Sequence, residues 1–169
     1  MKYYFLLITL FIFISTGCDK NSTEPDDPDP GLRFSPSEIS SSTGEQFEIS
    51  LNLSDVSEPF FGVSLRITFD ESMIGYNDQA GMQKGDLFGD DAIVFAALQD
   101  SVIHISLTQI QGDTEITGSG TLGTLTFSAY SSGEGVINLT EEFLHFYDQY
   151  GDEIQMSIAV IDSALVHIP

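Results

Sequence analysis

The alternation of apolar with small or polar residues between positions 60 and 69 constrains this fold more than any other feature. The stretch FFGVSLRITF places Phe, Val, Leu, Ile and Phe at every second position after Phe60. A period of two puts these side chains on one face of a β-strand and the intervening ones on the other. Because the apolar face must be covered, the pattern predicts a second sheet packed against it. The opposite face remains for water or for a partner.

Other segments repeat this pattern, and no stretch shows a sustained helical period. Further strands are expected at 32–34, 47–53, 73–76, 102–108, 122–129, 136–139, 142–147 and 157–168. The run 93–98 is apolar at almost every position, which predicts a strand buried on both faces. The polar segment 55–59 is expected to turn the chain into the strand at 60–69. Many short strands separated by turns predict an all-β sandwich.

The charge balance excludes nucleic acid as a partner. Among 169 residues, 26 are acidic and 5 are basic, which gives a net charge of −21. Binding to phosphates requires clustered Lys and Arg, and this chain has too few. Strong like charge keeps molecules apart in solution, so we expect a monomer.

The N-terminal segment has the features of an export signal. Met1 and Lys2 precede an apolar run at 3–14, and three small residues then lead to Cys18. The run is too short to span a membrane but suits a secretory signal peptide. A lone cysteine directly after a small residue resembles the lipobox of bacterial lipoproteins. That resemblance implies a signal peptide at 1–17 and a lipid on Cys18 that anchors the chain in the cell envelope, at the outer membrane or cell surface.

The residues after Cys18 are expected to form a linker. Residues 18–31 are acidic and rich in proline, and such a composition cannot bury enough apolar surface to fold. We therefore expect an extended tether at 18–31, followed by one sandwich domain at 32–169.

The order of features in this domain resembles the cohesin domain, a bacterial module that receives dockerin in cellulosome-type assemblies. The resemblance begins with EQFEISLNLSDV (45–56) and FFGVSLRITFDESMIGY (60–76). Its most specific part is GSGTLGTLTFSAYSSGEGVINLTEEFLHFYDQYGDEI (118–154), and SALVHI (163–168) resembles the closing strand. The family fold implied is a two-sheet jelly-roll sandwich of about nine strands.

The resemblance also implies a binding face. In the cohesin family, the sheet that contains the third, fifth and sixth strands forms the protein-binding platform. Carried over by position, this predicts a partner-binding face made of Ser64, Arg66, Thr68, His104, Ser106 and Thr108. The partner implied is a dockerin-bearing protein, such as an enzyme of polysaccharide breakdown. Calcium would then be carried by the dockerin, and the chain itself needs no cofactor.

Catalytic and metal-binding patterns are not found in the sequence. His104, His145 and His167 are isolated, without the spacing of metal ligands on one element. Glu141 and Glu142 are adjacent and would face opposite ways in a strand, so they cannot form a glycosidase pair by themselves. No nucleophile elbow, phosphate loop or dinucleotide fingerprint occurs. We expect no catalytic residues and no metal site, and therefore a binding protein rather than an enzyme.

Two alternatives to dockerin recognition remain open. The first is a carbohydrate-binding module, in which Tyr76, Tyr130, Tyr147 and Tyr150 stack on the sugars of a polysaccharide; the chain has no Trp for this purpose. The second is an adhesion or structural surface module that has kept the fold but does not bind dockerin.

Overall fold

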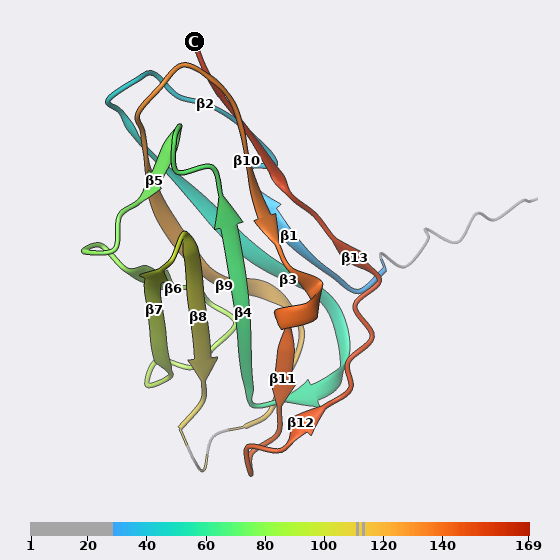
Figure 1. Ribbon diagram of the computed structural model, residues 1–169. Helices are drawn as coiled ribbons and strands as arrows, with labels where there is room; N and C mark the ends of the chain where they lie inside the picture. Colours follow the sequence, from blue (N-terminus) through green and yellow to red (C-terminus); the bar gives the residue numbers. More distant parts are fainter. Residues whose placement is uncertain (1–28, 111, 113) are drawn as a thin grey trace, which may run out of the picture.

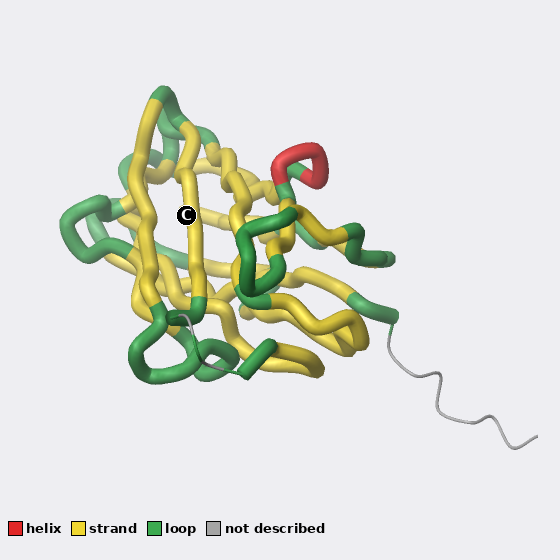
Figure 2. Tube along the Cα trace, turned by 90° about the horizontal axis from the view of Figure 1, so that it is seen from below, coloured by secondary structure: helices red, strands yellow, loops and turns green. Residues whose placement is uncertain are grey.

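Two packed β-sheets make up the structure, a computed structural model that describes residues 29–110, 112 and 114–169 (Figure 1). Within these residues the single helical element is η1 (Glu141–Phe143), one turn of 3-10 helix. Figure 2 shows this turn standing clear of the strands. The predicted all-β sandwich is confirmed. The predicted signal peptide, Cys18 and most of the predicted tether lie outside the described residues.

One sheet, sheet A, has six strands. Their order is β13 (Val160–Ile161), β1 (Gly31–Ser35), β3 (Gln46–Phe60), β9 (Ile116–Ala129) and β5 (Ile74–Tyr76), with β6 (Met82–Lys84) also paired to β9. The long antiparallel pair of β3 and β9 forms its centre.

The other sheet, sheet B, has eight strands and faces the viewer in Figure 1. One path through it runs β12 (Glu153–Ile154), β11 (His145–Tyr147), β4 (Gly62–Phe69), β10 (Gly133–Leu139), β14 (Ala164–Ile168) and β2 (Glu38–Ser40). On its other edge β4 pairs with β8 (Val102–Thr108), which pairs in turn with β7 (Ile93–Gln99). Both β10 and β11 pair with one edge of β4, and η1 lies between them in the chain.

The core lies between the two sheets, as the alternation predicts. The inward side chains of β4 are each at most 9% exposed and belong to this core; they are Val63, Leu65, Ile67 and Phe69. Phe61 was expected on the same side, but it lies outside the core cluster and lines a hollow on sheet B. Aromatic rings join the sheets across this core. Phe60 of sheet A meets Phe146 of sheet B with ring centroids 5.2 Å apart, and Phe69 meets Phe127 at 5.5 Å. Edge-to-face contacts of this kind add to the free energy gained from burial alone.

Two local predictions were wrong. Residues 55–59 do not turn the chain, because β3 continues to Phe60. Pairing with β9 is maintained there through register shifts, and Asp55 takes a positive φ of 55°. The expected strand at 142–147 begins only at His145, since η1 interrupts it. The described residues form fourteen strands where about nine were expected, because several are pieces of two or three residues.

Candidate docking face

The six residues predicted to bind a partner lie together on the outward side of sheet B. Ser64 is paired with Ser106, and Arg66 is paired with His104. Paired residues on antiparallel strands project to the same side of the sheet. We call this surface the β4–β8 face and define it by the outward residues of β4, β8 and β7: Gly62, Ser64, Arg66, Thr68, Val102, His104, Ser106, Thr108, Ile93, Phe95, Ala97 and Gln99. That this face binds a partner stays a prediction.

Strand β7 adds an apolar margin to this face, contrary to the prediction that 93–98 is buried on both sides. It pairs with β8 alone among the described strands and so forms an edge of sheet B. Ile93 is 59% exposed and Phe95 is 58% exposed, on the same side as Ser106. Large apolar side chains clustered in the open are typical of binding surfaces.

Arg66 occupies the centre of the face and is half-buried. Its guanidinium carbon lies 3.8 Å from the centroid of the Phe143 ring, which η1 brings over β4. This is cation–π geometry, and it holds the guanidinium against the ring. Among the described residues Arg66 forms no ion pair.

Two of the three histidines, isolated in the sequence, approach this centre. His104 is paired with Arg66, and His145 is paired with Ser64 on the other edge of β4. His145 Nδ1 lies 2.8 Å from the Glu153 carboxylate. His167 lies apart on β14, 3.9 Å from Glu134. No group of three His, Cys, Asp or Glu side chains in the described part of the chain is arranged to hold a metal ion.

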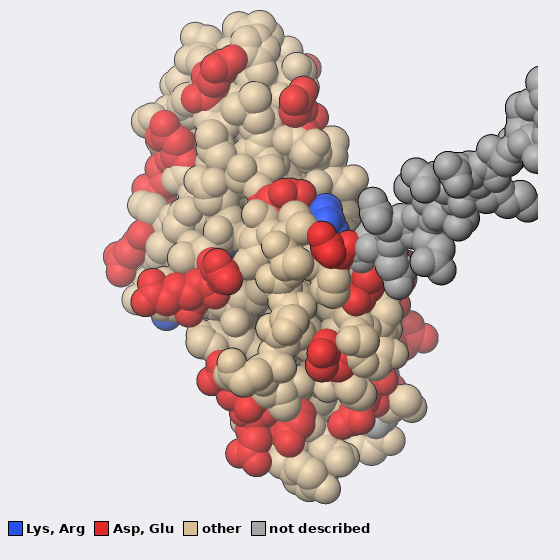
Figure 3. Space-filling view, turned by 90° about the vertical axis from the view of Figure 1, so that its right-hand side faces the viewer, with Lys and Arg blue, Asp and Glu red and all other residues tan. Residues whose placement is uncertain are grey.

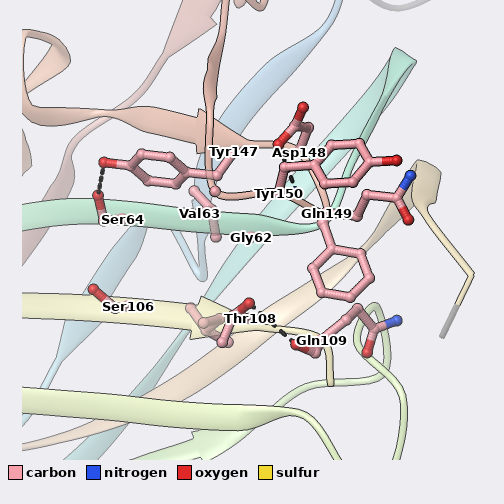
Figure 4. Close-up of a pocket in the computed structure, with 13 residues that line it drawn as sticks. Gly62, Val63, Ser64, Ser106, Thr108, Gln109, Tyr147, Asp148, Gln149 and Tyr150 are labelled. Carbon is pink, nitrogen blue, oxygen red and sulfur yellow. Dashed lines mark hydrogen bonds between the residues drawn. The ribbon is translucent and has the colours of Figure 1, made fainter. Parts of the chain in front are cut away.

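The face is hollowed along β4. One hollow of about 540 Å³ lies at the β11–β12 turn, and a second of about 320 Å³ surrounds Arg66. They share Ser64, Ser106 and Tyr147 and therefore form one groove. Figure 4 shows the larger hollow. Tyr147 points along β4 toward Ser64, and Tyr150 points in the other direction, away from Ser64. The hydroxyl oxygens of Tyr147 and Ser64 are 3.3 Å apart.

The four tyrosines considered for sugar stacking do not share one surface. Tyr76 is only 6% exposed and packs in the core, so it cannot serve as a platform, and that part of the prediction was wrong. Tyr130 is 57% exposed and lines a different hollow, beside Gly75. Tyr147 and Tyr150 alone lie next to the β4–β8 face.

Two groups with displaced pKa values lie away from the centre of the face. The hydroxyl and backbone N–H of Ser72 donate to Asp70 at the end of β4, and these bonds lower the pKa of the Asp70 carboxyl. Burial, with a smaller contribution from Asp78, raises the pKa of Tyr76 to about 12. The Tyr76 hydroxyl finds no hydrogen-bond partner among the described residues.

The charged residues of the chain are predominantly acidic, 26 against 5 basic ones. Figure 3, which views the molecule from the side, shows Asp and Glu scattered over the surface and few basic side chains. In the described part of the chain no helix is long and apolar enough to cross a membrane.

Sequence reasoning missed three residues that shape the face. Ile93 and Phe95 sit in an apolar run that looks the same for a buried strand and for an edge strand with an apolar outer side. Phe143 follows two glutamates, and nothing in its neighbourhood signals contact with Arg66.

The fold and the comparisons agree on the class of protein. The structure is a two-sheet sandwich of the jelly-roll type, and the Cohesin domain family model matches residues 33–166. The chain belongs to the cohesin domain family. A search of curated proteins found no match.

Solved cohesin structures share this fold at low sequence identity. A type II cohesin from the cellulosome of Acetivibrio cellulolyticus superposes with a TM-score of 0.68 and 17% identity, over 82% of this chain and 95% of that one. A non-cellulosomal cohesin from the archaeon Archaeoglobus fulgidus gives 0.64 and 13%, over 83% and 91%. A cohesin from a type II cohesin–X-dockerin complex of A. cellulolyticus gives 0.66 and 12%, over 83% and 99%.

Proposed function

We propose that this chain is a cell-envelope-anchored docking module that binds a dockerin-type protein partner non-covalently through the β4–β8 face. The observation that carries this proposal is the composition of the face. It combines an apolar margin at Ile93 and Phe95 with a half-buried polar centre around Arg66. Aromatic residues and arginine are enriched at specific protein interfaces and often contribute most of the binding energy.

Family membership supports the proposal of a dockerin-type partner. Among the similar structures is a type II cohesin in complex with an X-dockerin, and another is a cohesin in complex with a dockerin. The face proposed here joins β4, β7 and β8 in one sheet, and it contains the six residues for which the cohesin resemblance predicts partner binding. By the same reasoning the docked protein is a dockerin-bearing enzyme that degrades surface polysaccharide.

Anchoring follows from the N-terminal sequence. The apolar run at 3–14 before Cys18 supports export and lipidation, and residues 18–31 then supply the tether between lipid and domain. A Cys18→Ser variant should lose retention in the envelope fraction and leave the detergent phase. Unchanged partitioning would contradict lipid anchoring.

A second candidate function is favoured by the larger hollow. Tyr147 and Tyr150 line it together with the side chains of Gln109 and Gln149, a combination that suits a neutral sugar. Retention of the protein on insoluble polysaccharide, lost in Tyr150→Ala, would support a carbohydrate-binding module.

The decisive experiment is a chelator-controlled capture. Residues 19–169 are immobilised and exposed to native secreted protein with calcium or with excess chelator. We expect capture of a discrete protein that chelator abolishes, because a dockerin folds around its own calcium. Capture that chelator does not affect would favour the adhesion alternative.

A further inference from the structure

Arg66 differs from the other described basic residues because its side chain has neither an ion pair nor a hydrogen bond among the described residues. Arg33 Nε lies 3.4 Å from the Asp162 carboxylate. Lys84 Nζ donates to the backbone carbonyls of Phe88 and Gly89 at 3.1 and 2.7 Å. Arg66 contacts the ring of Phe143 and has no ion pair among the described residues.

The hollow around Arg66 is lined without a single carboxylate, although the chain carries 26 acidic residues. Its polar lining consists of donors and hydroxyls: Ser64, Arg66, His104, Ser106, His145 and Tyr147. The nearby Glu153 carboxylate lies 2.8 Å from His145 Nδ1 and is engaged there. Glu141 and Glu142 of η1 are exposed and do not line the hollow. The centre of the β4–β8 face is therefore a local anion-receptive site on a protein of strongly negative charge.

We propose that this hollow binds the side-chain carboxylate of an Asp or Glu on the docking partner. The inference rests on the proposed docking function and specifies the chemistry of its partner. The Arg66 side chain contacts the Phe143 ring and has no hydrogen bond or ion pair among the described residues, so its N–H groups are available for a two-pronged bond to a carboxylate. His104 and the hydroxyls of Ser64 and Ser106 supply further donors on the same surface. The partner presents this acid within an apolar contact, because Ile93 and Phe95 border the site.

The first test needs no partner. N-acetyl-glutamate N-methylamide is titrated into residues 19–169 while the side-chain resonances of arginine and histidine are followed by NMR. We expect a saturable shift of Arg66 Nε–H and of the neighbouring His104, with no shift of Arg33. The glutamine analogue should leave Arg66 unchanged. Equal shifts with both compounds, or none with either, would overturn the carboxylate site.

The second test uses the captured partner and a matched pair of variants. Arg66→Gln should weaken binding by about 30-fold or more, whereas Arg33→Gln on the other sheet should bind like the wild type. Arg66→Glu should abolish binding, and an acid-to-lysine change in the partner should restore it. Binding that tolerates Arg66→Glu overturns the inference but leaves the docking function intact. Absence of any calcium-dependent capture refutes the docking function, and the NMR titration then still decides the carboxylate site.

Discussion

The outward sides of the two sheets differ in how many of their polar side chains already have a hydrogen-bond partner. On sheet A the hydroxyls bond to one another: Ser50 Oγ lies 2.9 Å from Thr124 Oγ1, and Thr121 donates to Asn52 at 2.8 Å. Arg33 completes the pattern by donating to Ser54. These groups on sheet A already have partners and would gain little from being covered.

On the β4–β8 face Ser64 is bonded to Tyr147 and Thr108 to the Gln109 carbonyl, but other polar groups are left available. The exposed Ser106 hydroxyl has no partner among the described residues, and Arg66 meets only a ring. Beside them stand the exposed side chains of Ile93 and Phe95. A surface of this kind gains hydrogen bonds and buried apolar area when it is covered. Polar content alone therefore does not identify a binding face; what matters is whether its polar groups are already paired.

The largest expected effect is on partner binding. Phe95→Ala should weaken capture of the partner by about 30-fold, because a large aromatic anchor at an interface contributes about 2 kcal/mol. Thr126→Ala on the outward side of sheet A is the matched control and should leave affinity unchanged. Calorimetric titration of both variants checks this. Equal losses from both would remove the distinction between the faces.

A hydroxyl buried between the sheets should behave differently from those on either outward side. Tyr76→Phe removes an unpaired buried hydroxyl and should raise the free energy of unfolding by roughly 1 kcal/mol or more. Folding raises the pKa of Tyr76 to about 12, so the folded state favours the neutral phenol. The free energy of unfolding that depends on this neutral form is fully present below about pH 10. It is lost as pH rises toward 12. Urea unfolding of the variant should lack this alkaline decline, and a variant less stable than wild type would contradict the reading.

Hydroxyls on the two outward sides should differ in stability. Thr124→Val leaves Ser50 without its partner and should lower the free energy of unfolding by about 1 kcal/mol. Ser106→Ala should change it by less than about 0.5 kcal/mol, because that hydroxyl bonds to nothing in the described part of the chain. Thermal unfolding of the two variants side by side provides the measurement. The reverse order would show that the hydroxyls of sheet B are structural.

The smallest effect concerns the turn that ends β4. The pKa of Asp70 is lowered by its bonds from Ser72, so its contribution is present at neutral pH and is lost as pH falls through the lowered pKa. Asp70→Asn keeps an acceptor but removes the charge that these bonds favour, so it should be slightly less stable than wild type at pH 7 and should lose part of the acid sensitivity. Unfolding curves between neutral and strongly acidic pH test this. An acid limb identical to wild type would show that the turn does not contribute.

The period-two patterns of β4 and β8 predicted correctly which side chains face the core and which face outward. The same patterns do not contain the register, so the pairing of Arg66 with His104 became visible only in the sheet. The prediction that β7 is buried on both faces was wrong, because an edge strand with an apolar outer side has the same composition as a buried strand. At 55–59, Asp, Ser and Pro favour a turn locally, and pairing with β9 overrides that preference. The contact of Phe143 with Arg66 depends on η1, a tertiary detail without a local signal.

The two-sided pairing of β1 has a mechanical consequence. β1 holds five register pairs with β3 on one edge and pairs in parallel with β13 on the other. A pull on the chain ahead of Gly31, directed along this strand, would load those hydrogen bonds together in shear instead of opening them one after another. The end of the domain nearest the proposed anchor is therefore built to carry tension while the proposed partner is bound on the opposite sheet.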